Sequence, residues 1–363
     1  MTIMMNGKKR MVLSAGVFAA MVSLVLAGVL AGCSSSPKPA RPAPGKADLP
    51  EWYLNPAAVY PDDVYLTAVG TGDTRRAAEQ QAMAGLSQIF EANIQVDMTT
   101  QERYRDIVTA QGDFSEAEVE LAQTTSVQSA QRLTNVQMGE AAVDESGRVH
   151  AIAYIERLPT GRLYVDLIEK NAAQVASFLT QADASDNLIR EYAYVSAAWI
   201  IASGNELLRD QLRIIAPSMG QMVQLPYSYD SLIQRRTDIA SGMRVSISIT
   251  GDTGDRVEGV VRQALGEERF PVSATDPVLR VTGRVQVEPI ELTSDFESAR
   301  WVLNLDVAGP DGSSIVSYDD QGRSSAVTTE SAIAFAYRDI QAAVKNNFVS
   351  RLRGYFDGLV LGD

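Results

Sequence analysis

The sequence predicts an α+β fold in which two small β-sheet domains carry packed helices and a helical segment joins them. Two blocks of the chain each begin with a β run, continue into a helix and then return to extended runs. The stretch between these blocks has apolar residues at helical spacing only. Strands and helices in this order favour sheets with helices on one face. The expected bounds are 50–184 for the first domain, 185–240 for the helical connector and 241–363 for the second domain.

The first domain is expected to start with a strand followed by a helix. "VYLTAV" (64–69) has the composition of a short strand, and a helix follows from about Thr74, with Asp73 as its N-cap. "ANIQVDM" (92–98) is interpreted as the start of another strand. The apolar residues of the helix recur at helical spacing and predict one buried face, formed by Ala78, Ala82, Leu86, Ile89 and Phe90.

A hairpin and a long helical region follow. The extended runs 132–144 and 148–157 are separated by "ESG", which predicts a β-hairpin, and 158–182 returns to helical spacing. In the connector, Gly204 is interpreted as the break between two apolar helices. Pro217 and Pro226 bracket a loop, so the connector is consistent with a helical hairpin that bridges the domains.

The second domain begins the β pattern again. "MRVSISIT" (243–250) alternates as a strand does, and 251–265 is expected to be a capped helix. Two long strands, 279–292 and 299–309, lead into the tight turn "GPDG" and the return strand "SIVSYDD". An amphipathic helix is expected from about Thr329 to Phe356.

The segment TGDT occurs twice, at 71–74 and at 250–253, each time between a β run and a helix. A glycine eases the exit from a strand, and Asp or Thr oxygens cap the first amides of a helix. Duplication of one unit and independent use of the same capping chemistry both explain the echo.

The start of the chain has the layout of a secretory signal. A basic patch, Lys8 to Arg10, precedes an uncharged run that extends to Gly32. The run is also long enough for a membrane span, for which about 18 apolar residues suffice. It ends at Leu30-Ala31-Gly32-Cys33. These four residues resemble the bacterial lipobox, in which the cysteine thiol is alkylated with diacylglycerol, the chain is cut before the cysteine, and the new amino group is acylated.

Residues 1–32 are therefore expected to be a lipoprotein signal peptide, and Cys33 is expected to be the lipidated residue that anchors the protein in a membrane. Cys33 is the only cysteine in 363 residues, so no disulfide within one chain is expected. Ser34 follows it, which resembles the outer-membrane default of Gram-negative lipoproteins. The predicted location is the outer membrane, with the folded domains in the periplasm.

Residues 33–49 form a tether rich in proline and serine. Proline-rich chains favour extended polyproline II at ~3.1 Å per residue, so the tether reaches roughly 50 Å from the bilayer. The formal net charge of −13 repels nucleic acid and anionic headgroups, and no nucleic-acid partner is expected. A basic protein partner is compatible with this charge but is not required by it.

No catalytic, cofactor-binding or metal-binding residue is predicted. Gly70-Thr71-Gly72 lacks the third glycine of a dinucleotide fingerprint, and the chain has no P-loop and no EF-hand loop. His150 is the only histidine, so a multi-histidine metal site is not available. We expect it to be a half-exposed strand residue and not a general base, since no G-x-S-x-G elbow accompanies it. Three carboxylate pairs next to turn residues are interpreted as solvated turns: Asp62–Asp63, Glu267–Glu268 and Asp319–Asp320.

Three motifs of the first domain occur together in a known family. "PEWYLNP" (50–56), "VYLTAVGTGDT" (64–74) and the alanine-rich "AAEQQAMAGLSQIF" resemble the LPP-twenty (LPP20) family of bacterial envelope lipoproteins. "GRVHAIAYIER" (147–157) fits the closing strand of that family, and the resemblance extends over 50 to about 180. The family has no catalytic constellation to carry over, and its members include lipoproteins attached to flagellar outer-membrane rings and discs. The resemblance therefore implies a non-enzymatic envelope protein that faces the periplasm.

The second domain is more distantly similar to the small α+β modules in the amino-terminal domain of TolB and in lipoprotein activators of peptidoglycan synthases. Two classes of function follow from these patterns. One is a structural or assembly component of an envelope complex, flagellar or other, that forms homo-oligomers. The alternative is a tethered regulator of a periplasmic or inner-membrane cell-wall enzyme. An acid-based hydrolase is a third, less favoured class. The sequence does not name the partner proteins.

Overall fold

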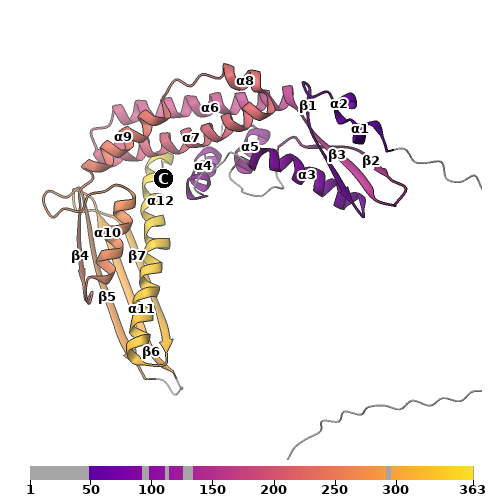
Figure 1. Cartoon of the computed structure of the whole chain (residues 1–363). Helices are drawn as coiled ribbons and strands as arrows, with labels where there is room; N and C mark the ends of the chain where they lie inside the picture. The colour runs from indigo at the N-terminus through magenta and orange to yellow at the C-terminus, as the bar shows by residue number, and fades with distance from the viewer. Residues whose placement is uncertain (1–48, 92–97, 111–113, 126–133, 292–295, 363) are drawn as a thin grey trace, which may run out of the picture. The chain divides into compact units, whose positions relative to one another are not determined.

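The computed structural model describes residues 49–91, 98–110, 114–125, 134–291 and 296–362 (Figure 1). The predicted signal peptide, Cys33 and all but the last residue of the tether lie outside these ranges, so they stay predictions. The strand expected at "ANIQVDM" falls on 92–97, which also lies outside them, and Met98 is the first residue of a helix. Within the described residues the α+β prediction is confirmed, with one three-stranded and one four-stranded sheet.

The first sheet has the strand order β1-β3-β2, with both neighbouring pairs antiparallel. The predicted hairpin is confirmed as β2 and β3. Two short helices precede β1, and helix α3 packs against β1 and β3. The bounds are α1 Glu51–Leu54, α2 Pro56–Val59, β1 Tyr65–Gly72, α3 Arg75–Glu91, β2 Gln137–Val143 and β3 Val149–Glu156.

The capping residue of helix α3 is Thr74, one residue after the N-cap that the sequence predicts. The hydroxyl oxygen of Thr74, and not the carboxylate of Asp73, accepts a hydrogen bond from the Ala77 amide at 3.2 Å. This bond satisfies one of the amides that the first turn leaves free. The predicted buried face is confirmed for its four other members, but Ile89 is 38 % exposed.

The two glycines of the first TGDT region let α3 approach β1 closely. Gly70 and Gly72 lie inside β1 and not in a turn after it. A Cβ atom at Gly70 would overlap the Ala78 carbonyl oxygen and the Ala82 amide nitrogen. Contact between backbones at this distance leaves no room for a side chain, so the position requires glycine.

The helices that follow form a layer of their own, in which α6 and α7 lie side by side (Figure 1). Helices α4 and α5 pack against this layer, in a stretch to which the sequence pattern assigns no element. The Asn187 side chain caps α7 by accepting hydrogen bonds from two amides of its first turn. The bounds are α4 Met98–Ala110, α5 Glu116–Thr125, α6 Arg157–Asp183, α7 Leu188–Ile215, α8 Pro217–Met222 and α9 Tyr229–Gly242.

The predicted break at Gly204 is wrong, because α7 runs through it without interruption. Gly204 faces the ring of Tyr104 on α4, and a Cβ atom at this position would lie 2.5 Å from a ring carbon. The glycine therefore allows an aromatic ring to pack against the helix backbone. Helix α7 also joins two cores, since Ile200 and Leu208 pack with the first domain whereas Ile189 and Tyr192 pack with the second.

The second sheet has the strand order β4-β5-β6-β7. Strands β4 and β5 are parallel neighbours joined through α10, and the remaining pairs are antiparallel. The Asp252 carboxylate caps α10 by accepting from the amides of Arg256, Val257 and Glu258, at 3.1, 2.9 and 2.8 Å. The bounds are β4 Val245–Thr250, α10 Arg256–Glu267, β5 Leu279–Ile290, β6 Glu297–Ala308 and β7 Ser314–Ala326.

Helices cover one face of this sheet and leave the other face open. Trp301, Leu303 and Leu305 of β6 are buried under the helices, whereas Arg300 and Asn304, which point to the opposite face, are exposed. The terminal helical region is confirmed as α11 Thr329–Ala343 and α12 Val349–Leu361, joined without a break by a π turn, Val344–Phe348.

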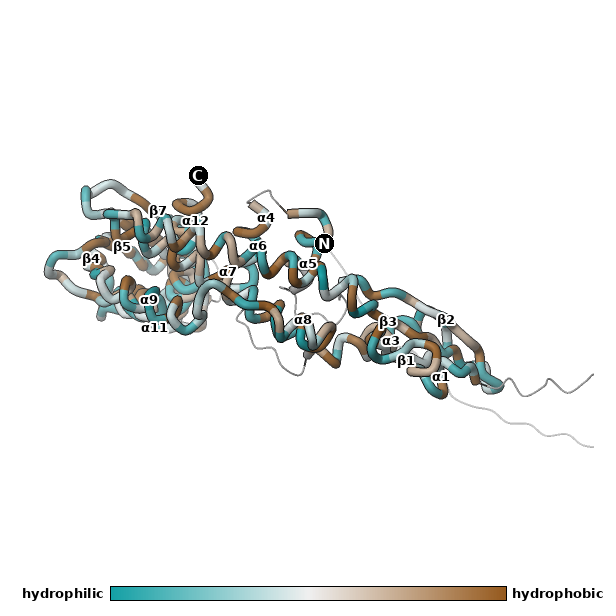
Figure 2. Tube along the Cα trace, turned by 90° about the horizontal axis from the view of Figure 1, so that it is seen from above, coloured by the Kyte–Doolittle hydropathy of each residue, from teal (hydrophilic) through white to brown (hydrophobic). Residues whose placement is uncertain are grey.

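Apolar and polar residues are interspersed along the described elements (Figure 2). Among the residues that the structure describes, none of the helices combines the length and apolar character needed to span a bilayer.

Candidate functional site

The single histidine is part of a buried polar cluster and is not half-exposed as the sequence predicts. His150 on β3 is 4 % exposed. The strand register places it opposite Thr71 on β1, whose hydroxyl lies 3.0 Å from His150 Nδ1. On the other side of the ring, Nε2 lies 2.9 Å from Oδ2 of Asp144. The prediction failed because burial here depends on a neighbouring strand that is distant in sequence.

Asp144 sits at the turn between β2 and β3 and holds this turn closed. Its Oδ1 accepts hydrogen bonds from the Ser146 hydroxyl at 2.6 Å, the Ser146 amide at 2.8 Å and the Arg148 amide at 3.0 Å. The bonds from Ser146 and His150 hold the pKa of the Asp144 carboxyl well below its usual range. With Asp144 ionised, its carboxylate accepts from Nε2–H of His150, and the Thr71 hydroxyl is hydrogen-bonded to Nδ1 on the other side of the ring.

The chain of hydroxyl, imidazole and carboxylate has the order of groups found in a hydrolytic triad, but its surroundings differ. The ring of Tyr53 lies over the imidazole, with 4.2 Å between the ring centroids. The amide of Thr71 is already bonded to Oε1 of Gln81 at 2.5 Å. The cluster connects helix α1, through Tyr53, and the β2–β3 turn, through Asp144, to strand β1. This is a structural arrangement.

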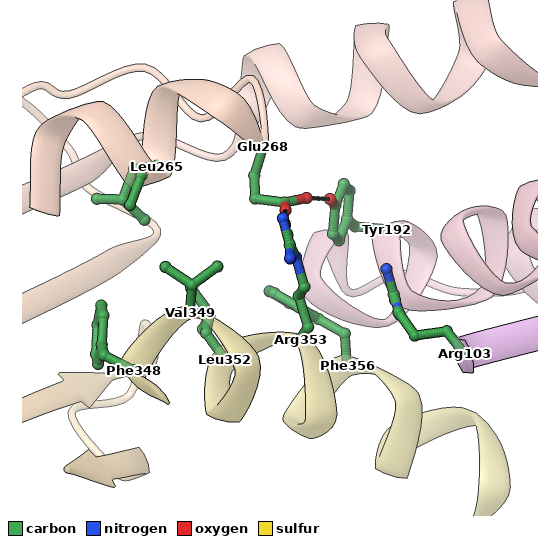
Figure 3. Close-up of a pocket in the computed structure, with 10 residues that line it drawn as sticks. Arg103, Tyr192, Leu265, Glu268, Phe348, Val349, Leu352, Arg353 and Phe356 are labelled. Carbon is green, nitrogen blue, oxygen red and sulfur yellow. Dashed lines mark hydrogen bonds and ion pairs between the residues drawn. The ribbon is translucent and has the colours of Figure 1, made fainter. Parts of the chain in front are cut away.

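A second buried cluster lies where α4, α7, α10 and α12 meet (Figure 3), and Arg236 of α9 also contacts it. Its centre is Glu268, which is 7 % exposed and directly follows α10. Glu268 accepts hydrogen bonds from Arg353 at 2.6 Å, from Arg236 at 2.8 Å and from the Tyr192 hydroxyl at 3.3 Å. Glu268 is therefore not part of a solvated turn, which corrects the prediction for the Glu267–Glu268 pair.

A bidentate ion pair completes this cluster. Arg103 on α4 donates to both carboxylate oxygens of Asp357 on α12, at 2.9 and 2.7 Å. Burial lowers the pKa of Arg103, but the bonds and charge of Asp357 outweigh burial and raise it. Burial alone would raise the pKa of Glu268, yet the charges of Arg353 and Arg236 hold it below its usual value. Both shifts favour the charged forms of Arg103 and Glu268.

The cavity beside this cluster has a volume of about 10 Å³, room for roughly one water molecule. Apolar side chains from α10, α12 and the π turn form most of its wall, including Leu265, Phe348 and Leu352 (Figure 3). Because the enclosed space is so small, we interpret the cluster as a set of contacts that connects these helices rigidly. Sequence reasoning missed it because the partners of Glu268 lie 32 and 85 positions away along the chain.

The other predicted carboxylate pairs differ in their surroundings. Asp62 and Asp63 are exposed in a turn, as predicted. Asp319 and Asp320 lie in the middle of β7 and not at a turn, which corrects that prediction. Within the described ranges, no three His, Cys, Asp or Glu side chains come together in a way that could hold a metal ion.

Comparisons with known proteins bear on the lipoprotein resemblance. No curated protein matches the chain. A minor lipoprotein from Acinetobacter baumannii of known structure is similar over 31 % of this chain and 91 % of its own, with 12 % identity and a TM-score of 0.26. A secreted protein from Helicobacter pylori is similar over 78 % of this chain and 98 % of its own, with 12 % identity and a TM-score of 0.39. The family model of the LPP20 lipoproteins matches residues 50–156, so the resemblance seen in the sequence motifs is confirmed over this segment.

Proposed function

We propose that this protein is held at the outer membrane by an acylated Cys33 and that its folded part is a non-enzymatic structural or assembly component of an envelope complex. The observation that carries the proposal is the order of features along the chain: a lipobox-like segment, a proline-rich tether and then an LPP20 segment from residue 50. Two or more acyl chains, each contributing ~0.8 kcal/mol per buried methylene, give stable anchoring where one chain does not.

The buried polar clusters support a structural role. His150 and Glu268 each form two or more hydrogen bonds within the described chain. Polar side chains fixed in this way orient helices and strands, and the cavity beside Glu268 has room for only about one water. A rigid set of elements behind a long tether suits a component that other subunits assemble on.

The anchoring part of the proposal is tested by Cys33→Ala. We expect the variant to lose its lipid and to leave the outer-membrane fraction, or to persist as an uncleaved precursor. Mass spectrometry of the wild-type chain should show the acylated amino-terminal cysteine. A variant that fractionates with the outer membrane as the wild type does would contradict the proposal.

The assembly part is tested by the size of the full-length lipoprotein, extracted in mild detergent and measured by sedimentation. We expect species larger than a monomer. The length of the tether favours a second candidate, a regulator that reaches a cell-wall enzyme, because roughly 50 Å of extended chain clears the headgroups. Shortening residues 36–48 should then abolish the activity of that partner, whereas a scaffold close to the membrane should tolerate the deletion.

A further inference from the structure

Strand β7 is a free edge of the second sheet. It is 13 residues long, and among the strands that the structure describes it pairs with β6 alone. Its odd-numbered side chains from 317 to 325 are exposed on the open face, and the even-numbered ones face the helices. An edge strand presents a row of unpaired N–H and C=O groups, and such a row is a template for pairing with another strand.

Two side-chain hydrogen bonds show which backbone groups point away from β6. The Ser317 carbonyl accepts from Arg351 on α12 at 2.9 Å, and the Gln321 amide donates to Asp320 Oδ1 at 2.8 Å. Because the direction of the backbone groups alternates along a strand, the N–H and C=O groups of Asp319 and Arg323 point the same way. Arg351 marks one end of the free segment, which runs from Asp319 toward the end of β7.

The two charged residues on the open face of this segment, Asp319 and Arg323, have no oppositely charged partner among the described residues. Arg323 lies directly opposite Arg300 of β6, and like charges in that position are destabilising. In the described part of the chain, Arg323 forms no ion pair with an acidic residue. Asp319 lies on the same face of β7, four residues before Arg323, and among the described residues its side chain is bonded only to the neutral Asn304 amide, at 2.6 Å.

We propose that β7 pairs antiparallel with β7 of a second copy of this chain, with Gln321 opposite Gln321 of that copy. This register places Asp319 opposite Arg323 of the second copy and, by symmetry, Arg323 opposite its Asp319. Each arginine thereby gains the carboxylate that its own sheet does not supply. Registers centred on Asp319, Asp320 or Arg323 would place like charges opposite each other, and a register centred on Gly322 would place Asp319 and Arg323 opposite neutral residues.

The pairing deepens the scaffold proposed above and rests on it, since it names the partner of the second domain as another copy of the chain. The interface is isologous, so it closes as a two-fold dimer of sheets. On pairing, the Gln321 amide exchanges the Asp320 carboxylate for a carbonyl of the second copy. In the separate chain, Asp320 therefore protects the centre of the edge.

The register is tested by disulfide formation in the full-length lipoprotein, oxidised in isolated membranes. Opposite residues of a hydrogen-bonded antiparallel pair have Cα atoms about 5.5 Å apart, within the range of about 4.4–6.8 Å that a disulfide bridges. We expect Gln321→Cys to give a covalent dimer. The parent chain is the control for Cys33, its only cysteine.

Arg323→Cys is the matched control on the same edge. In the proposed register its counterpart lies four positions away, or about 13 Å along the strand, so this variant alone gives no dimer. Co-expression of Arg323→Cys with Asp319→Cys on a second, differently tagged chain should give a covalent heterodimer. This pair also tests the register if Gln321→Cys does not accumulate as folded protein.

Charge reversal tests the chemistry of the pairing. In the Gln321→Cys background, Asp319→Arg or Arg323→Asp replaces two attractive pairs by two repulsive ones and should lower the dimer yield about tenfold. The double variant, with both charges exchanged, should restore it. A double variant that crosslinks no better than the single ones would overturn the proposal, as would a dimer formed by Arg323→Cys alone.

Failure of this inference and failure of the scaffold proposal are distinguishable by sedimentation of the same membrane extracts. Particles larger than a monomer, together with no crosslink at 321 or at the 319–323 pair, would overturn the β7 interface and leave the scaffold proposal standing. A monomer at every concentration, again with no crosslink, would overturn both.

Discussion

The two sheets hold their first helix by different means, although the same four residues, TGDT, precede each helix. In the first sheet, Gly70 brings the backbone of α3 against β1, and Thr74 caps the helix through one amide. In the second sheet, α10 packs on its neighbours through valine and leucine side chains, and Asp252 caps it through three amides. The β1 strand has an antiparallel neighbour, whereas β4 has a parallel one reached through α10.

In both regions TGDT lies between a strand and a helix, but a different residue of the four caps the helix, Thr74 in the first and Asp252 in the second. The echo predicts where each helix begins, but it does not predict the sheet that the helix packs on. The buried charges differ in the same way. The Asp144–His150 cluster closes a local hairpin, and the Glu268 cluster joins helices from distant parts of the chain. Five predictions sharpen this comparison.

The largest effect is expected at Glu268. Glu268→Gln removes the charge that Arg236 and Arg353 share, and removing one partner of a buried ion pair costs about 3–5 kcal/mol. Urea denaturation of the full chain in detergent should show this loss. Glu267→Gln is the matched control on the adjacent exposed residue, where we expect a change within about 0.5 kcal/mol. Equal effects at the two positions would contradict the buried cluster.

Glu268 also predicts a dependence on pH. Its pKa in the folded protein is lowered, so its contribution to stability is present above the unfolded value of about 4.3 and is lost as pH falls through the folded pKa. Glu268→Gln should therefore weaken the dependence of unfolding free energy on pH in the acid range below about 4.3. A variant with the slope of the wild type would show that Glu268 titrates alike in both states.

Glycine substitutions should have opposite signs in the two regions. Gly70→Ala forces a Cβ atom into the backbone of α3 and should destabilise the protein by about 1–3 kcal/mol. Gly259→Ala on the exposed face of α10 meets open space and should stabilise it by about 0.5–1 kcal/mol, because alanine favours a helix. Thermal unfolding of the two variants measures both changes. A neutral Gly70→Ala would show that α3 does not need this approach.

The cap that accepts from more amides should contribute more to the free energy of unfolding. Asp252→Ala should cost about 1–2 kcal/mol, and Thr74→Ala should cost about 0.5–1 kcal/mol. Denaturation of each variant beside Asp73→Ala separates the two interpretations of the first cap. A larger effect at Asp73 than at Thr74 would restore the cap expected from the sequence.

The smallest effect is expected for Asp144→Asn, and it should be confined to the β2–β3 hairpin. Asp144→Asn removes the charge that accepts from Ser146, Arg148 and His150. Hydrogen exchange at the amides of Ser146 and Arg148 should become faster, with little change elsewhere in the chain. Unchanged exchange at these two amides would indicate that the turn is held by its backbone bonds alone.

Patterns that are local in sequence predicted much of this fold. The β2–β3 hairpin, the long strands and the face of α3 follow from spacing over a few residues. What the sequence could not predict depends on distant partners. Gly204 packs against the ring of Tyr104, which lies on another helix. Because the local sequence pattern does not show this contact, it predicts a helix break at Gly204. His150 and Glu268 are buried by residues that only the tertiary fold brings near them.

The π turn between α11 and α12 allows one continuous helix to contact two different sets of neighbours. Its wider coil offsets the phase of the apolar stripe, so that Ile340 faces the sheet core while Phe356 meets Tyr192 on α7. If all five residues of Val344–Phe348 wound as a regular α-helix instead, everything downstream would be rotated by about 100°. Asp357 would then swing away from Arg103, and the chain would lose the link between its last helix and α4.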